Sequence, residues 1–78
     1  MARVAIIDDS EDVLELFRVI LRNDDEYLTY SSGLNFLEDF SPGRFALILL
    51  DIAMPLMDGF EVLRRVQALD KDVPVSGR

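Results

Sequence analysis

The sequence predicts an α/β fold with a parallel sheet, and three observations carry this prediction. Segments of strand length alternate along the chain with segments whose apolar residues recur at helical spacing. The runs at residues 3–7 and 45–50 lack the polar alternation of a half-exposed strand, which is typical of strands covered on both faces in parallel sheets. Each of these two runs is followed directly by aspartate, which marks the end of the predicted strand.

The first half of the chain contains two predicted strand–helix pairs. Residues 3–7 form the first strand, and Ser10 is placed to cap a helix whose acidic first turn complements the helix dipole. The apolar residues expected on one face of this helix are Val13, Leu14, Leu16, Phe17, Ile20 and Leu21. Residues 27–30 are rich in aromatic and β-branched side chains, which favours a second strand. A weaker helical pattern covers residues 34–40 and ends at the Ser-Pro-Gly sequence that follows.

The second half of the chain adds a third pair and the beginning of a fourth strand. Residues 45–50 form the third strand, which Asp51 stops. After a loop that contains Pro55, a helix is expected from about Gly59, with Asp58 as its N-cap. Residues 73–75 then begin another strand. The predicted order is β-α-β-α-β-α followed by the start of a strand, in one domain over residues 1–78.

The composition excludes several classes of function. The chain has 78 residues and no Cys or His, which excludes disulfides, thiolate nucleophiles, histidine metal ligands and histidine-dependent catalysis. With 15 acidic residues against 8 basic ones, its formal net charge is -7, so it is a poor binder of nucleic acid. The longest apolar stretch is far too short to span a bilayer. We therefore expect a soluble cytoplasmic domain with no nucleic-acid or membrane partner.

Three carboxylates follow two of the predicted buried strands. Asp8 and Asp9 end the first strand, and Asp51 ends the third. If these strands are neighbours, the carboxylates converge in one small pocket, because ligands bind beyond the carboxyl ends of strands in open parallel sheets. Carboxylates packed together repel each other unless a cation lies between them, and an oxygen-only cluster selects Mg²⁺. Each aspartate taken alone also fits a simpler role as a helix cap or a solvated turn residue.

Two motifs resemble the receiver domain of two-component response regulators. The first is Val-Ala-Ile-Ile-Asp-Asp at residues 4–9, and the second is Leu-Leu-Asp-Ile-Ala-Met-Pro-Leu-Met-Asp-Gly at residues 49–59. The second motif is the specific one, since a strand-ending Asp followed by Met-Pro-x-Met-Asp-Gly is rarely found elsewhere. The resemblance covers the entire chain and implies a flavodoxin-like sheet with helices on both faces.

The resemblance also implies a chemistry for the pocket. Asp51 is the implied phosphoacceptor, which receives the phosphoryl group from a histidine kinase or phosphotransfer protein. Asp9 and Asp51 are the implied direct ligands of Mg²⁺, with Asp8 acting through water and the backbone carbonyl of Ala53 completing the protein ligands. Pro55 and Gly59 are implied to shape the loop into the third helix. The chain is not expected to be an enzyme beyond self-phosphorylation and autodephosphorylation.

The resemblance also predicts that the fold is incomplete at its C-terminal side. A receiver has five strand–helix units, and this chain supplies three units and the start of a fourth strand. The Thr or Ser and the Lys with which the family contacts the phosphoryl group have no counterpart, because Ser76 comes too early and Lys71 lies at the end of the third helix. The missing strands predict an exposed edge beside the third strand, and we expect a homodimer that covers this edge.

Two other functions remain open from the sequence. The chain would act as a self-associating structural or interaction module, natural or engineered, if the inherited motif were chemically idle. A Mg²⁺-dependent phosphatase of the haloacid type starts from the same strand-ending aspartate. That chemistry requires a second aspartate two residues after the nucleophile, and Ala53 occupies this position.

Overall fold

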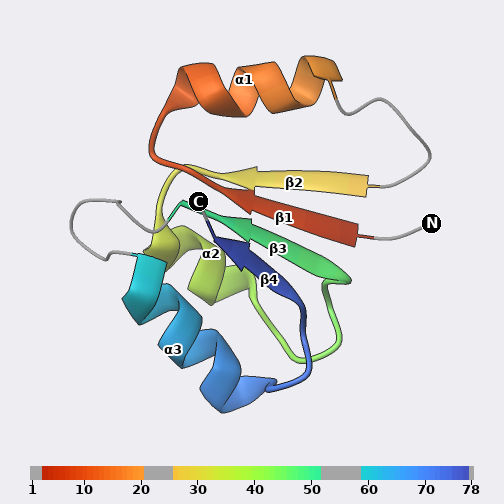
Figure 1. Cartoon of the computed structure of the whole chain (residues 1–78), viewed down its shortest axis with the longest axis vertical. Coiled ribbons are helices and arrows are strands. Elements are labelled where there is room, and N and C mark those ends of the chain that lie inside the picture. Colours follow the sequence, from red (N-terminus) through yellow and green to blue (C-terminus); the bar gives the residue numbers. More distant parts are fainter. Residues whose placement is uncertain (1–2, 21–25, 52–58, 78) are drawn as a thin grey trace.

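The computed structural model describes residues 3–20, 26–51 and 59–77, which form a four-stranded sheet with helices on both faces. The strands are β1 (Arg3–Ile7), β2 (Glu26–Tyr30), β3 (Leu47–Leu50) and β4 (Val75–Gly77). All three strand pairings are parallel, and the order across the sheet is β2-β1-β3-β4. Figure 1 shows the four arrows pointing in one direction. The predicted α/β class and the adjacency of the first and third strands are confirmed.

Three helices connect the strands and form two outer layers. They are α1 (Glu11–Ile20), α2 (Gly33–Asp39) and α3 (Gly59–Leu69). In Figure 1, α1 lies on one side of the sheet, and α2 and α3 lie on the other. This arrangement is the flavodoxin-like layering that the resemblance to receiver domains implies.

The alternation of side chains along the strands divides the core into two parts. Ile48 and Leu50 of β3 are fully buried, and they pack in the cluster that α2 and α3 cover. Leu47 and Leu49 of the same strand face the other way and are only partly buried, beside Val4 and the other members of the smaller cluster under α1. One helix therefore covers its face of the sheet less completely than two helices cover theirs.

Aromatic rings fill the larger part of the core. Phe36 makes edge or tilted contacts with Tyr30, Phe40 and Phe45 at centroid distances of 5.2, 5.6 and 5.5 Å. Phe45 is buried in this group but precedes β3, which begins at Leu47. The predicted third strand is therefore two residues too long at its start, because the apolar character of Phe45 reflects packing under α2 and α3 rather than pairing.

The apolar face predicted for α1 is only partly buried. Leu14 is 1% exposed, whereas Leu16 and Ile20 are 56% and 62% exposed. The predicted apolar face is therefore covered only in part, with Leu16 and Ile20 outside the covered part, and Leu21 lies outside the described residues. Their helical spacing points these two side chains away from the sheet, where no described segment packs on them.

The fourth strand forms, although it is short. Val75, Ser76 and Gly77 pair with Ile48, Leu49 and Leu50. On this side the edge of the described sheet is β4, beside β3, as the predicted start of a fourth strand implies, and β4 begins at Val75, two residues later than predicted. No helix in the described part of the chain is long and apolar enough to cross a membrane.

Candidate metal site

The pairing of β1 with β3 places Asp8 and Asp51 side by side. Ile7 is level with Leu50 in the parallel register, so the next residue of each strand is an aspartate at the same edge of the sheet. The backbone amide of Asp51 donates to the carbonyl of Ile7 at 2.9 Å. The amide of Asp8 donates to the carbonyl of Tyr30 in β2 at 3.0 Å. Both aspartates are therefore anchored by the sheet hydrogen bonds themselves.

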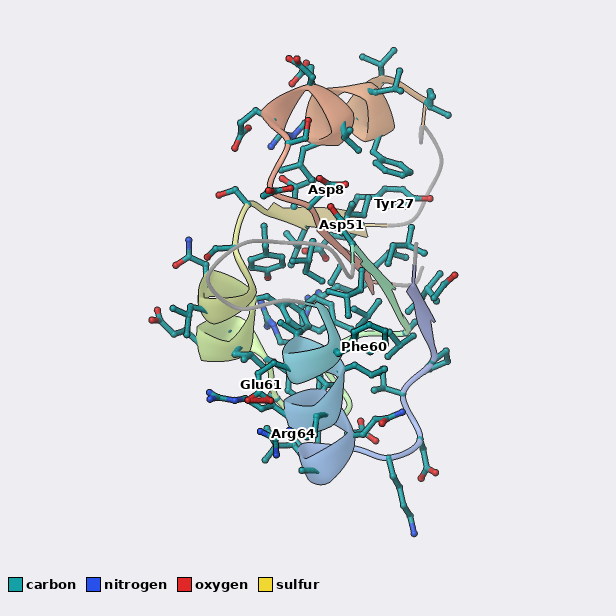
Figure 2. All side chains as sticks on the ribbon, turned by 60° about the vertical axis from the view of Figure 1, so that its left-hand side comes forward. Asp8, Tyr27, Asp51, Phe60, Glu61 and Arg64 are labelled. Atoms are coloured by element: carbon teal, nitrogen blue, oxygen red, sulfur yellow. The ribbon has the colours of Figure 1, made fainter. Side chains whose placement is uncertain are left out.

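The three predicted carboxylates form one cluster. Asp8, Asp9 and Asp51 each offer an oxygen within 4.8 Å of the others. Asp8 is only 2% exposed, Asp51 is half-buried and Asp9 is exposed. Figure 2 shows Asp8 and Asp51 close to each other at the end of the sheet beside the start of α1. The cluster thus has a buried base and a side that is open to solvent.

The chemistry of this cluster fits a hard divalent cation. Every ligand atom is a carboxylate oxygen, and three formal negative charges at this spacing are stabilised by a cation between them. Softer transition metals favour imidazole or thiolate ligands, which the sequence lacks because it has no His or Cys. Three protein oxygens also leave coordination positions for water or a phosphoryl oxygen, as Mg²⁺ requires.

The turn between β1 and α1 orients the most buried member of the cluster. The backbone amide of Ser10 donates to Oδ1 of Asp8 at 2.9 Å. The Ser10 hydroxyl accepts from the amide of Val13 at 3.4 Å, which makes Ser10 the N-cap of α1, as its sequence position predicts. The bond from Ser10 to Asp8 is not among the predicted contacts, although an aspartate two residues before a capping serine is the pattern that permits it.

Several other predicted site residues lie elsewhere. Ala53, Pro55 and Asp58 lie outside the described residues, so their predicted roles stay predictions. Ser76 is level with Leu49, two residues before Asp51, and its position agrees with the expectation that it comes too early. Lys71 follows the C-terminal end of α3 and precedes β4, so it lies near the amino ends of the strands, whereas the carboxylates lie at their carboxyl ends.

Tyr30 also belongs to a second polar group, which it forms with Arg44 and with Asp39 at the end of α2. The Tyr30 hydroxyl donates to Oδ2 of Asp39, which also accepts from Arg44 at 3.2 Å. Burial, together with the hydrogen bond to Asp39, raises the pKa of Tyr30 to about 12. The same hydrogen bond is the largest cause that lowers the pKa of Asp39, and the hydrogen bond and positive charge of Arg44 lower it further. Tyr30 therefore holds Asp8 through its carbonyl and α2 through its ring hydroxyl.

Comparison with known sequences finds response regulators. The family model of the response regulator receiver domain matches residues 4–76. The transcriptional regulatory protein PrrA of Mycobacterium tuberculosis is 39% identical over 74 residues, which cover 94% of this chain and 32% of PrrA. The sporulation initiation phosphotransferase F of Bacillus subtilis is 32% identical over 75 residues, which cover 94% of this chain and 60% of that protein. The chain thus spans less than two thirds of these relatives.

Solved structures give the same result for the fold. The N-terminal domain of a response regulator receiver protein from Methanoculleus marisnigri has a TM-score of 0.87 at 33% identity, with coverage of 99% of this chain and 65% of that one. A chain in the complex of histidine kinase ThkA with response regulator TrrA has a TM-score of 0.86 at 29% identity, with coverage of 99% and 67%. The fold of this chain thus matches that of receiver domains in solved structures.

Proposed function

The chain belongs to the family of response regulator receiver domains, and we propose that Asp51 is its phosphoacceptor and that Asp8, Asp9 and Asp51 bind Mg²⁺. The single observation that carries the proposal is the convergence of these three carboxylates within 4.8 Å at the carboxyl ends of β1 and β3. Asp51 is the member that ends β3 and is half-buried, so it combines a fixed position with access from solvent.

The proposed reaction is phosphoryl transfer from a phosphohistidine. A carboxylate oxygen of Asp51 attacks phosphorus in line, the P–O bond forms, and the P–N bond to the donor imidazole breaks. The electron pair of the broken bond remains on the imidazole nitrogen, which takes up a proton from solvent. The product is an acyl phosphate on Asp51. The chain contains no His, so the donor histidine lies outside residues 1–78.

The proposed cation supplies charge neutralisation for the phosphoryl oxygens. Asp9 and Asp51 would hold it directly, Asp8 would act through water, and the backbone carbonyl of Ala53 would complete the protein ligands. Asp9 is exposed and Asp51 is half-buried, whereas Asp8 is the most buried of the three. This difference in exposure supports separate roles for Asp8 and for the other two aspartates. The task of this chain is to hold the carboxylates at fixed positions and to leave one side of the cluster open.

We further propose that the phosphodonor is a histidine kinase or a phosphotransfer protein. The similarity to a chain in the ThkA–TrrA complex supports the first, and the similarity to sporulation initiation phosphotransferase F supports a phosphorelay setting. Either donor must approach the carboxyl ends of the strands, because Asp51 lies at that edge.

The experiment is incubation with acetyl phosphate, or with beryllofluoride, in the presence and absence of Mg²⁺. We expect a phosphoryl adduct by intact mass, or a bound fluoride signal by NMR, that requires Mg²⁺ and disappears in Asp51→Asn. Asp72→Asn is the matched control, because Asp72 is an exposed aspartate between α3 and β4 at the opposite edge. No adduct on the wild-type chain, or one that persists in Asp51→Asn, contradicts the proposal.

Self-association is a second candidate function, and the exposed face of α1 favours it. Leu16, Val19 and Ile20 are 56%, 51% and 62% exposed on one helix of ten residues. We name these three residues the α1 stripe. We propose that a second copy of the chain covers the α1 stripe, in preference to the β4 edge, because β4 has three residues and its Ser76 and Gly77 offer little apolar surface.

A further inference from the structure

Ser10 connects the candidate metal site to the first helix through three hydrogen bonds. Its amide donates to Oδ1 of Asp8 at 2.9 Å, and its hydroxyl accepts from the amide of Val13 at 3.4 Å. Its backbone carbonyl accepts from the amide of Leu14 at 3.1 Å, which is the first bond of the helical ladder. One residue therefore contacts the most buried carboxylate on one side and begins α1 on the other.

We propose that Ser10 is a positioning residue for Mg²⁺ binding, which fixes the orientation of the Asp8 carboxylate by locking the N-cap conformation of α1. This inference rests on the proposed function, since it concerns the same cation. Ser10 is not proposed as a ligand. Its hydroxyl is engaged with the helix, and the group that contacts Asp8 is its backbone amide.

The direction of the Ser10 amide depends on the backbone conformation at the N-cap. An N-cap residue leaves the helical conformation, and its hydroxyl bond to the first turn holds it there. If the hydroxyl is removed, residue 10 gains alternative conformations, and its amide no longer points at Asp8 in all of them. Groups that orient a metal ligand from outside the coordination sphere usually change metal affinity by about 10- to 100-fold when they are removed.

The packing of α1 makes this linkage rigid. Leu14, whose amide bonds to Ser10, is 1% exposed and packs with Val4 and Ile6 of β1. Asp8 follows the same strand after Ile7 and is 2% exposed. The turn from Asp8 to Leu14 is thus fixed at both ends by β1, and Ser10 makes hydrogen bonds to both halves of it.

The chain contains a matched control for the capping function. Ser32 is the N-cap of α2, and its hydroxyl accepts from the amide of Asn35 at 3.1 Å. Its carbonyl accepts from the amide of Phe36 at 3.2 Å, as that of Ser10 does from Leu14. No bond from the Ser32 amide to a carboxylate is described in the part of the chain that the structure covers. Ser32→Ala therefore removes a cap of the same kind from a helix that starts without a metal ligand.

The test compares Mg²⁺ affinities of the wild-type chain, Ser10→Ala, Ser10→Thr and Ser32→Ala by NMR titration with MgCl₂. Urea unfolding in EDTA gives the stability of each metal-free chain. We expect Ser10→Ala and Ser32→Ala to lower the urea midpoint by similar amounts. Only Ser10→Ala should weaken Mg²⁺ binding, by about 3- to 10-fold. This effect is smaller than complete loss of the hydrogen bond to Asp8 would give, because the backbone amide of residue 10 remains. Ser10→Thr, which keeps the hydroxyl, should restore the affinity.

The outcomes separate this inference from the proposed function. If the wild-type chain binds no Mg²⁺, the proposed metal site is wrong, and the inference falls with it. If the wild-type chain binds Mg²⁺ and Ser10→Ala binds it equally well, only the inference is overturned. Equal weakening in Ser32→Ala also overturns it, because the effect would then be loss of helix stability. The rate of hydrogen exchange at the Ser10 amide, measured in EDTA, tests the contact with Asp8 in the absence of metal. This rate should rise when Asp8 is changed to Ala.

Discussion

Tyr30 shows how one residue can serve the site and the core through different atoms. Its carbonyl accepts from the amide of Asp8, so it fixes the base of the carboxylate cluster. Its ring packs at 5.2 Å from Phe36 in an edge-on contact, and its hydroxyl donates to Asp39 at the end of α2. The backbone part of this arrangement is independent of the side chain, which makes the two roles separable by substitution.

Tyr30→Phe is expected to change the pH dependence of stability and to leave Mg²⁺ binding intact. The pKa of Tyr30 is raised from 10.0 to about 12 in the folded chain. The stability that follows from the raised pKa is complete below the unfolded value and is lost as the pH rises through the folded value. Urea unfolding between pH 8 and 12 should therefore show a steep alkaline loss in the wild-type chain and a shallower loss in Tyr30→Phe.

Urea unfolding at acidic pH, carried below the ordinary carboxyl pKa, provides a second test of the same hydrogen bond. The hydrogen bond from Tyr30 is the largest cause that lowers the pKa of Asp39 below its ordinary value of 3.8. A lowered carboxyl pKa gives stability that is present above the unfolded pKa and is lost as the pH falls through the folded value. Tyr30→Phe should reduce this acid-side loss as well. An unchanged profile on both sides would show that the hydroxyl contact does not form in solution.

The positions of the three site aspartates could be predicted from the sequence, whereas the contacts of Ser10 and Tyr30 could not. Asp8 and Asp51 each end an apolar run, and the parallel register makes such residues neighbours. The bond from Ser10 to Asp8 depends on the exact turn between strand and helix, and that of Tyr30 to Asp39 depends on the packing angle of α2. Neither turn geometry nor packing angle is encoded in a periodic pattern of apolar residues.

At the scale of elements, the kind and order of the helices and strands were predictable, and their burial was less so. The helical period of α1 predicts one broad apolar face, but Leu16 and Ile20 lie far around the helix from Leu14, and the sheet buries only Leu14. The period identifies an apolar face without showing how wide a surface another element covers. Phe45 illustrates the same limit for strands, since its apolar side chain is buried under α2 and α3 before the pairing of β3 begins.

The α1 stripe leads to a prediction at this scale. Ile20→Ser is expected to shift the chain from dimer to monomer, because it replaces the most exposed apolar side chain of the α1 stripe, which is 62% exposed. Leu69→Ser is the matched control, since Leu69 of α3 is 59% exposed and lies outside the stripe. Size-exclusion chromatography with light scattering measures the mass of each variant over a range of concentrations.

Three outcomes of this experiment are informative. A dimer in the wild-type chain and in Leu69→Ser, with a monomer in Ile20→Ser, supports the α1 stripe as the interface. A dimer that survives Ile20→Ser moves the interface to another surface, such as the β4 edge. A folded wild-type monomer at all concentrations contradicts self-association and leaves the stripe to another occupant, such as a further segment of a longer protein.

At the scale of the whole molecule, the acidic side chains affect stability in two ways, through the net charge of the whole chain and through the local cluster of three carboxylates. The net charge of -7 opposes compaction of the entire chain, and added salt of any kind screens this repulsion. The cluster of Asp8, Asp9 and Asp51 is different, because its carboxylates lie within 4.8 Å of each other and screening by monovalent ions reaches the buried Asp8 poorly. The two contributions should respond differently to the identity of the cation.

We therefore expect MgCl₂ to stabilise the folded chain more than NaCl does at equal ionic strength. A ligand at ten times its Kd stabilises the folded state by about 1.4 kcal/mol when it binds one site and has no affinity for the unfolded chain. Asp9→Asn should remove this Mg²⁺-specific increment, and it should raise stability in EDTA, because one of three neighbouring negative charges is lost and Asp9 is exposed enough to leave packing unchanged. Asp72→Asn, at the opposite edge, should keep the increment. Urea unfolding in NaCl with EDTA and in MgCl₂ measures both quantities. Equal stabilisation by the two salts in the wild-type chain would mean that the carboxylates respond to ionic strength alone. If Asp9→Asn is more stable than the wild-type chain in NaCl with EDTA but less stable in MgCl₂, the cation lies at the cluster.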